Sequence, residues 1–284
     1  MLKTGLVMEG GAMRGLFTAG VMDVFMEKGI RFDGAVGVSA GATFGCNYKS
    51  RQIGRVIRYN KRFCRDWRFG SIRSFLKTGD IYNADFCYRD LPGELDIFDT
   101  KTYAENPMEF YYVCTDAESG EAVYYKSSDG GEKDLQWMRA SASIPILSRM
   151  VPIEGGFYCD GGCIDPIPLK YFESIGYQRN VVLLTQPQGF RQEPSRMEGL
   201  IEFLLRKYPE LVRTLKGRAE RYNQELDYVA DREMKGEALV IRPPESLRIG
   251  KMEDDPRELE RVYQIGRRTA ERRMEEVQTF LGTA

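Results

Sequence analysis

Short apolar runs that alternate with amphipathic stretches dominate the first fifty positions of the chain. Residues 4–9 form an apolar run that predicts a buried strand, and residues 10–15 form a glycine-rich turn. Residues 16–29 place apolar side chains at helical spacing on a broad face. A second buried strand is expected over residues 32–39, with another helix from Ala40. This alternation of strands and helices predicts a parallel sheet covered by helices.

The middle and C-terminal parts of the chain carry the same two kinds of pattern. Alternation over residues 110–126 predicts a hairpin that turns around Glu118, Ser119 and Gly120. Short apolar runs predict further strands at residues 156–162, 180–187 and 238–244. Helices are expected at residues 134–145, 168–176 and 196–207, from a break at Pro209 to about Asp231, and at 257–280.

No repeat, low-complexity segment or linker interrupts these patterns. We therefore expect one α/β domain over residues 1–284, a length that a single large domain can reach. Its motif-bearing core is expected at about residues 4–190, and a helical C-terminal part at about residues 191–284.

Composition narrows the class of protein. The net charge is −1, so the chain as a whole does not attract nucleic acid, and we expect no nucleic-acid partner. The apolar runs are too short for a transmembrane helix, and the N-terminus lacks a signal-peptide pattern. Six scattered cysteines without any histidine indicate neither a disulfide scaffold nor a zinc site. We expect a cytoplasmic protein with reduced thiols and with no metal or other cofactor.

A G-x-S-x-G pattern lies between the second predicted strand and the helix that follows it. Gly37 and Gly41 flank Ser39 at the positions where a sharp strand-to-helix turn needs small residues. Such a turn presents a serine as a nucleophile, while a turn of small residues without chemistry is the plain alternative. The chain contains no histidine, so the usual partner of a nucleophilic serine is missing.

A second glycine-rich loop, from Gly10 to Gly15, follows the first predicted strand and opens a helix. Its backbone N–H groups and the helix N-terminus suit an oxyanion hole, and they also suit phosphate. As a dinucleotide-binding G-x-G-x-x-G pattern it has Ala12 at the middle glycine, with Asp33 lying 18 residues beyond Gly15. We favour the oxyanion hole because Ser39 ends the next strand, and neighbouring parallel strands bring both loops to one edge.

The proton of Ser39 needs an acceptor other than histidine. Asp, Glu, Lys, Cys and Tyr remain, and an S-x-x-K arrangement is excluded because Ala42 stands at its lysine position. The best candidate is a carboxylate on a tight glycine turn at the end of a strand. Asp160, followed by Gly161 and Gly162, meets that description. The plain alternative for an Asp-Gly pair is a hairpin turn.

Together these three elements resemble the patatin-like phospholipase family, whose members use a Ser–Asp dyad without histidine. The family's elbow matches Gly37–Gly41, its glycine-rich oxyanion loop matches Gly10–Gly15, and its D-G-G/A turn matches Asp160–Gly162. The stretches RASASIP before the aspartate and DPIP after it are similar to bacterial cytosolic members. The resemblance covers roughly residues 4–190. One departure is Ala12, which replaces a third glycine but keeps its N–H.

The resemblance implies the patatin-like fold, a three-layer α/β/α arrangement with a mainly parallel central sheet. It also implies a serine acyl hydrolase of the phospholipase, lysophospholipase or esterase type, with a lipid or ester substrate. Ser39 is then the nucleophile and Asp160 the base. The alternatives are an acyltransferase of related fold and a nucleotide- or lipid-binding module with a silent serine. The oxyanion hole is expected from the loop residues Gly10, Gly11, Ala12, Arg14 and Gly15.

One segment has a charge that differs from the rest of the chain. Residues 49–79 contain ten Lys or Arg and one acidic residue, Asp66. The plain interpretation is a solvated helical face with a few core residues. The sharper interpretation is contact with an anionic membrane surface, which places the protein at the periphery of a membrane. Aromatic residues are interleaved with these cations: Tyr59, Phe63, Trp67, Phe69 and Phe75.

Overall fold

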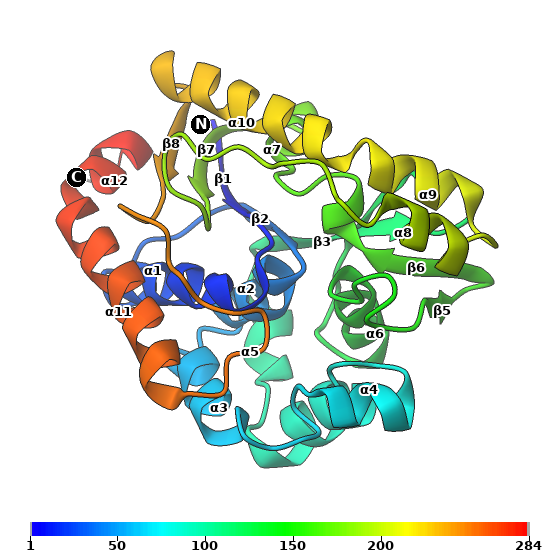
Figure 1. Ribbon diagram of the computed structural model, residues 1–284. Coiled ribbons are helices and arrows are strands. Elements are labelled where there is room, and N and C mark those ends of the chain that lie inside the picture. The colour runs from blue at the N-terminus through cyan, green and yellow to red at the C-terminus, as the bar shows by residue number, and fades with distance from the viewer. Residues whose placement is uncertain (1, 283–284) are drawn as a thin grey trace.

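An eight-stranded sheet lies between two layers of helices in the computed structural model, which describes residues 2–282 (Figure 1). Neighbouring strands β3, β2, β1, β7 and β8 are parallel. Strands β4 and β6 both pair antiparallel with β3, and β5 pairs antiparallel with β6. This confirms the three-layer fold with a mainly parallel sheet. The strands are β1 (Lys3–Met8), β2 (Gly34–Val38), β3 (Glu109–Asp116), β4 (Ala122–Lys126), β5 (Val151–Ile153), β6 (Gly156–Asp160), β7 (Tyr177–Leu183) and β8 (Ala238–Ile241).

Two sets of helices cover the two faces of the sheet. Helices α7 and α10 pack on one face, and α1, α2, α3, α6 and α11 contribute to the core on the other. A π-helical segment, Phe86–Leu95, lies between α4 and α5. The helices are α1 (Gly15–Glu27), α2 (Ala40–Lys49), α3 (Arg55–Phe63), α4 (Ile72–Thr78), α5 (Thr100–Glu105), α6 (Glu132–Ser141), α7 (Leu169–Ser174), α8 (Glu198–Leu204), α9 (Pro209–Lys216), α10 (Arg218–Met234), α11 (Pro256–Arg272) and α12 (Met274–Leu281).

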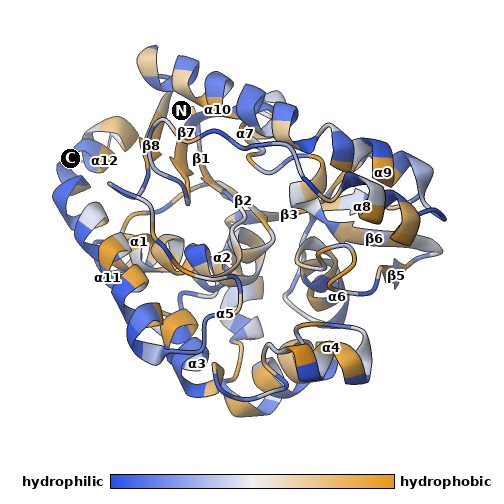
Figure 2. Cartoon of the chain, in the orientation of Figure 1, coloured by the Kyte–Doolittle hydropathy of each residue, from blue (hydrophilic) through white to orange (hydrophobic). Residues whose placement is uncertain are grey.

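The period of two along the strands divides the core between the two faces. On β1, Leu6 and Met8 belong to the core with α1 and α2, while Val7 belongs to the core with α7 and α10. Both faces of these strands are buried, as is usual for parallel sheets. Figure 2 shows the result, with apolar residues concentrated on the central strands and polar residues on the outward sides of α10 and α11.

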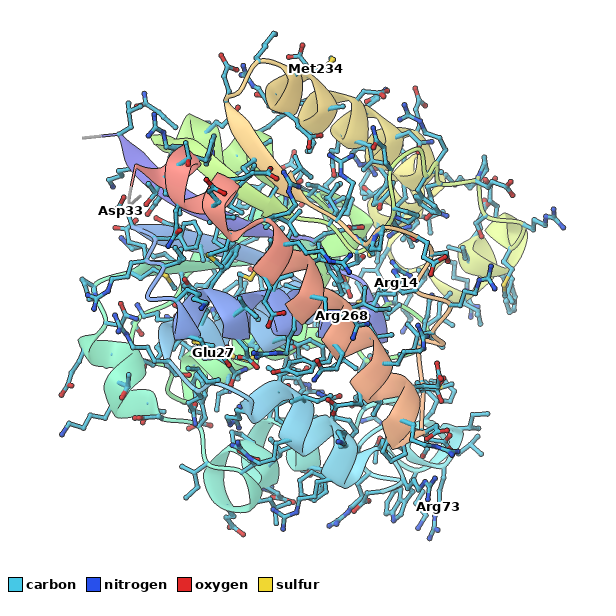
Figure 3. The ribbon with its side chains drawn as sticks, turned by 90° about the vertical axis from the view of Figure 1, so that its left-hand side faces the viewer. Arg14, Glu27, Asp33, Arg73, Met234 and Arg268 are labelled. Atoms are coloured by element: carbon cyan, nitrogen blue, oxygen red, sulfur yellow. The ribbon has the colours of Figure 1, made fainter. Side chains whose placement is uncertain are left out.

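The C-terminal part of the chain packs closely against the beginning. Helix α11 crosses α1 where both helices carry glycine (Figures 1 and 3). A Cβ on Gly266 would lie 2.0 Å from the Phe17 carbonyl oxygen, and one on Gly20 would lie 2.1 Å from that of Tyr263. Strand β8 also comes from the C-terminal part and pairs with β7. These contacts support a single domain over residues 1–284, which stays a prediction.

Most of the predicted elements are confirmed, and the differences have local causes. The helix expected to run from Pro209 to about Asp231 is divided into α9 and α10 at Gly217, since glycine is a weak helix former. The final helix is divided at Arg273, whose guanidinium donates to the Val240 carbonyl oxygen at 2.5 Å. Helix α6 ends at Ser141, before the expected stop near Pro145.

Within residues 2–282, no helix combines the length and the hydropathy that crossing a bilayer requires.

Candidate active site

Ser39 stands at a sharp turn between β2 and α2. Its backbone lies at φ 53° and ψ −117°, a conformation that residues other than glycine rarely adopt. A Cβ on Gly37 would lie 2.3 Å from the Gly41 carbonyl oxygen, and one on Gly41 would lie 2.4 Å from that of Met8. The Ser39 N–H donates to Ser141 Oγ at 3.1 Å. The chain therefore forms the turn that G-x-S-x-G predicts, and both glycines are sterically required.

Asp160 lies beside Ser39, although the two residues are far apart in the sequence. The Ser39 side chain lies near the Asp160 carboxylate, close enough to lower the pKa of that carboxyl. The N–H of Gly162 donates to Asp160 Oδ1 at 2.7 Å, which fixes the orientation of the carboxylate. The main chain of Asp160 is also held, because its N–H donates to the Ser143 carbonyl oxygen at 2.9 Å and its carbonyl accepts Thr115 Oγ1 at 2.8 Å. The structure thus brings the two predicted residues together.

The base turn, Asp160–Gly162, is a 3₁₀ turn that leads toward α7 and not a hairpin. A Cβ on Gly161 would lie 2.3 Å from the Val113 carbonyl oxygen, so this glycine is also required. Burial raises the pKa of Asp160, while the nearby Ser39 side chain, the bond from Gly162 and the positive charges of Arg218 and Lys251 oppose that rise. A carboxylate with a raised pKa is a better proton acceptor than an ordinary aspartate.

The oxyanion loop, Gly10–Gly15, connects β1 to α1 and lies against the elbow. A Cβ on Gly10 would lie 3.1 Å from Ser39 Cβ, and one on Gly15 would lie 2.8 Å from Ala40 Cβ. Among the described residues, no acceptor pairs with the N–H groups of Gly10 and Gly11. These groups are thus available to a negative oxygen that forms beside Ser39.

Ala12 and Arg14 complete this loop. Ala12 adopts φ 49°, the left-handed region where glycine is favoured, at a cost of about 1 kcal/mol. This explains in physical terms why a third glycine suits the position. Arg14 Nε donates to Thr185 Oγ1 at 3.4 Å, and a Cβ on Gly11 would lie 2.7 Å from the same oxygen. Thr185, directly after β7, therefore packs against the loop.

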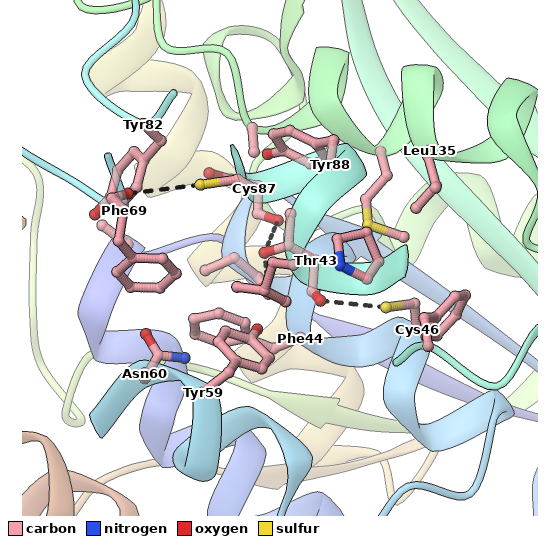
Figure 4. Close-up of a pocket in the computed structure, with 18 of the residues that line it drawn as sticks. Thr43, Phe44, Cys46, Tyr59, Asn60, Phe69, Tyr82, Cys87, Tyr88 and Leu135 are labelled. Atoms are coloured by element: carbon pink, nitrogen blue, oxygen red, sulfur yellow. Dashed lines mark hydrogen bonds between the residues drawn. The ribbon is translucent and has the colours of Figure 1, made fainter. Parts of the chain in front are cut away.

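An apolar cavity of about 120 Å³ lies beside Ser39 (Figure 4). Ser39 and Ala12 both line it, together with residues from α2, α3, α6 and the π-helical segment. Asn60 also lines it, and its buried Oδ1 has no partner among the described residues. A cavity of about 150 Å³ accepts benzene, so this one has room for about five carbon atoms. Six aromatic side chains form part of its wall: Phe44, Tyr59, Phe69, Tyr82, Tyr88 and Phe98.

Two stretches of the chain match family models. Residues 6–173 match the family described as patatin-like phospholipase, and this match covers more than half of the chain, including Ser39 and Asp160. This chain belongs to the patatin-like phospholipase family. Residues 208–282 match a domain of unknown function, DUF6363. Membership of the patatin-like family indicates lipid hydrolysis at the level of the family.

This patatin-like protein is similar to several longer proteins. It is 32% identical to the uncharacterized protein YjjU of Escherichia coli strain K12, over 69% of this chain and 56% of YjjU. It is 27% identical to lysophospholipase nte1 of Aspergillus niger, over 61% of this chain but only 11% of that protein. The crystal structure of VipD from Legionella pneumophila aligns with a TM-score of 0.47 and 13% identity, covering 97% of this chain and 67% of VipD.

Several buried polar residues that support the site were not found from the sequence. Glu9 accepts the Thr185 N–H and the Tyr222 O–H, both at 2.5 Å, and burial raises its pKa. In the sequence, the one feature that points to Glu9 is its position as a carboxylate between an apolar strand and a glycine-rich loop. Ser141, which accepts the Ser39 N–H, donates its own hydroxyl to the Val113 carbonyl oxygen at 2.6 Å. The only sequence feature that points to Ser141 is its place in the stretch RASASIP, which is similar to the family.

Burial disfavours the thiolate form of several cysteines in this patatin-like protein. All six are free thiols, and burial raises the pKa of Cys46 to about 12. A hydrogen bond with Cys163 and burial together raise the pKa of Cys159, which precedes Asp160, well above its ordinary value. Within residues 2–282, no three His, Cys, Asp or Glu side chains are grouped as a metal site requires.

Several cations of the basic segment, residues 49–79, bond to other parts of the fold. On α3, Arg55 and Arg58 both pair with the buried carboxylate of Asp96. Arg62 donates to a backbone carbonyl at 2.8 Å. These cations hold α3 against the π-helical segment and the residues after it, so their first role is structural.

The cations of α4 have different surroundings. Arg73 and Lys77 both lie over the Trp67 ring, at 4.8 and 4.9 Å from its centre. Ile72 and Leu76 on the same helix are 65% and 78% exposed. Figure 3 shows Arg73 at the edge of the molecule. Exposed apolar side chains next to cations are typical of a surface that contacts lipid.

Proposed function

We propose that this protein is a lipid acyl hydrolase that cleaves a carboxylic ester through a Ser39–Asp160 dyad and an acyl-enzyme. One observation carries the proposal. Ser39 stands on a strained turn, its side chain lies near the buried Asp160 carboxylate, and a largely apolar cavity lies beside it. The same three features are what ester hydrolysis needs, namely a nucleophile, a base and an apolar site for an acyl chain. Family membership supports the same reaction.

The first half of the reaction forms the acyl-enzyme. Asp160 accepts the Ser39 hydroxyl proton while Oγ attacks the ester carbonyl carbon. The carbonyl oxygen becomes negative and is held by the N–H groups of Gly11 and Ala12, with Arg14 nearby. The intermediate then breaks its bond to the alcohol, which leaves with the proton from Asp160. The acyl group remains bonded to Ser39 Oγ.

The second half releases the acid. Water gives a proton to Asp160 as it attacks the acyl carbon, and the same loop holds the second oxyanion. The bond to Ser39 Oγ breaks, and Ser39 recovers its proton from Asp160. The sum is one ester and one water converted into one carboxylic acid and one alcohol. Asp160 must be ionised to begin, so the rate falls as pH falls through its raised pKa.

The cavity indicates which part of the substrate is bound by the protein. Its volume of about 120 Å³ fits about five carbons of an acyl chain, so longer chains must extend toward solvent or a membrane. One relative carries the name lysophospholipase. We therefore propose a single-chain lipid ester, such as a lysophospholipid, as the substrate class.

A substrate panel tests the proposal. Wild type, Ser39→Ala and the surface control Ser174→Ala are compared on lysophospholipids, diacyl phospholipids and p-nitrophenyl esters of increasing chain length. We expect hydrolysis by wild type and Ser174→Ala, and a loss of at least about a hundredfold in Ser39→Ala. Transfer of the acyl group to an added alcohol in place of water would favour the acyltransferase alternative. A fluorophosphonate that fails to label Ser39, with tight binding of NAD or NADP, would favour the binding module.

Contact with an anionic membrane is part of the same proposal, with a cytoplasmic location at the membrane periphery. We place the contact at α4 and α8, not at α3. Helix α8 exposes Leu200, Phe203 and Leu204, and Met197 directly before it is also exposed. Figure 1 shows α4 and α8 toward the same end of the molecule as β5 and β6. Exposed apolar side chains beside cations suit the interface of an anionic bilayer.

Vesicle flotation tests this contact. Replacing Arg73 and Lys77 together by Gln is expected to weaken binding to phosphatidylserine vesicles at low salt. The matched pair Arg257→Gln and Lys235→Gln removes the same charge from α11 and the end of α10, and is expected to have little effect. Equal binding by both double variants would argue against a contact through α4.

A further inference from the structure

Helix α10 reaches the active site from the C-terminal part of the chain. At its first residue, Arg218 Nε donates to the Gly162 carbonyl oxygen at 2.6 Å. One turn later, the Tyr222 O–H donates to Glu9 Oε1 at 2.5 Å. Residues four apart lie on the same side of a helix. One side of α10 therefore bonds to the base turn and to the residue before the oxyanion loop.

The contact at Glu9 continues through the oxyanion loop. Glu9 is 1% exposed, and its second oxygen accepts the Thr185 N–H at 2.5 Å. Thr185 Oγ1 in turn bonds to the Gly10 carbonyl oxygen at 3.2 Å and to Arg14 Nε at 3.4 Å. The ends of β1 and β7, the oxyanion loop and α10 thus share one connected set of hydrogen bonds.

The contact at Arg218 acts on the base turn. Gly162 accepts Arg218 through its carbonyl oxygen and donates its N–H to Asp160 Oδ1 at 2.7 Å. Arg221 adds a bond to the carbonyl oxygen of Cys163 at 3.3 Å. The residue that orients the Asp160 carboxylate is therefore itself held by α10.

We infer that Arg218 and Tyr222 are positioning residues that hold the base turn and the oxyanion loop in place around Ser39. The inference rests on the proposed function for its kinetic consequence, but not for the contacts themselves. It assigns a role to the stretch 208–282, which matches a domain of unknown function and contains α10. The catalytic groups come from one part of the chain and their support comes from another.

Burial makes the contact with Glu9 more than ordinary packing. A buried carboxylate is unfavourable unless its oxygens are hydrogen-bonded, and Tyr222 supplies the bond to Oε1. Loss of that hydroxyl leaves a buried acceptor unpaired directly before Gly10. The start of the oxyanion loop is expected to move to relieve it, since Gly10 and Gly11 lie outside regular secondary structure.

The positive charge of Arg218 gives it a second effect, on the pH dependence of the rate. The charged groups that face Asp160 are Arg218 on α10 and Lys251 after β8. The thiols of Cys114 and Cys159 lie against the same carboxylate and are kept protonated, because both have raised pKa values. The positive charge of Arg218 lowers the pKa of Asp160, so its removal raises that pKa further. The acid limb of the rate profile then moves to higher pH.

Hydrogen exchange tests the contacts without reference to any reaction. Tyr222→Phe is expected to raise amide exchange in residues 9–15 about tenfold, and Arg218→Gln in residues 160–164 by a similar factor. Lys235→Gln, at the C-terminal end of α10, serves as the control and is expected to change neither segment. Unchanged exchange in both segments, with the variants folded, would overturn the inference.

Kinetics then test the consequence for the proposed reaction. Tyr222→Phe and Arg218→Gln are each expected to lower kcat about tenfold with KM within about twofold, because neither residue lines the cavity beside Ser39. Arg218→Gln moves the acid limb to higher pH, and Arg218→Lys keeps the limb at its wild-type position. Unchanged kcat and pH profiles in these variants, in an enzyme that Ser39→Ala inactivates, would contradict a positioning role. If Ser39→Ala stays active, the proposed function fails, and the exchange result still decides whether α10 holds the loops.

Discussion

The two parts of the chain contribute to the site in different ways. The part that matches the patatin-like family supplies the groups of the proposed reaction, Ser39, Asp160 and the oxyanion loop. The part from α9 onward supplies Arg218 and Tyr222, which bond to a backbone carbonyl and a buried carboxylate. The glycine turns that carry the proposed catalytic groups can therefore be recognised in the sequence. The residues that hold those turns in place show no local sequence pattern.

The largest effect is expected from adding one methyl group at Gly41, in the part of the chain that carries the motifs. A Cβ in Gly41→Ala would lie 2.4 Å from the backbone oxygen of Met8, which has no flexible end to move. We expect hydrolysis to fall at least about a hundredfold and stability to fall by about 1–3 kcal/mol. Ester hydrolysis and a thermal melt measure both. Gly199→Ala, where a Cβ meets nothing within 4 Å, is the control. Near-normal activity in Gly41→Ala would show that the elbow is not sterically fixed.

In the C-terminal part of the chain, a buried carboxylate on α10 is expected to make stability depend on pH. Glu225 accepts the Ile167 N–H at 2.9 Å, and burial, together with the nearby charge of Asp165, raises its pKa to about 9. The folded protein binds this proton more tightly than the unfolded chain does. Its stabilising contribution is therefore complete at low pH and is lost as pH rises from about 4.5 through about 9.

Replacing this carboxylate by its amide removes the titration. Glu225→Gln is expected to melt near the wild-type temperature at pH 5 and clearly above it at pH 9. The exposed Glu220→Gln on the same helix is expected to follow wild type at both pH values. Melting curves that stay parallel for Glu225→Gln and wild type across this range would show that Glu225 does not carry a raised pKa.

The smallest expected effect concerns the one departure from the family pattern. Ala12 lies at φ 49°, so Ala12→Gly is expected to raise stability by about 1 kcal/mol or less, with activity at or above wild type. Ala230→Gly, inside α10, should instead lower stability by about 1 kcal/mol. Chemical denaturation compares the two. A destabilising effect of Ala12→Gly would mean that the methyl group makes contacts that outweigh the backbone strain.

Much of the fold follows from the sequence because apolar periodicity is a local property. The strands at residues 4–9 and 32–39, the hairpin over 110–126 and the late strand at 238–244 are confirmed. Strand β5 was not predicted, since three residues are too few to show a period. The π-helical segment Phe86–Leu95 was also missed, because it contains Pro92 and no helical repeat.

The candidate site also contains residues that the sequence predicts and residues that it does not. Glycine is required at positions 37, 41 and 161, because a Cβ there would collide with the backbone. These glycines can therefore be recognised in the sequence as parts of tight turns. These turns, the absence of histidine and the resemblance to the family together selected Ser39 and Asp160, which the structure places side by side. The bond from Tyr222 to Glu9 joins residues more than two hundred positions apart. No periodicity or spacing in one sequence points to such a pair, so only the folded chain reveals it.

Trapping the acyl-enzyme tests the central claim most directly. Wild type and Asp160→Asn are mixed with p-nitrophenyl butyrate, quenched at short times and digested, and the mass of the Ser39 peptide is measured beside the release of p-nitrophenol. The Ser39–Asp160 dyad predicts a butyryl group on Ser39 in wild type, formed at least about a hundredfold more slowly in Asp160→Asn. A butyryl group on another residue, or its formation on Ser39 at the wild-type rate in Asp160→Asn, would contradict it.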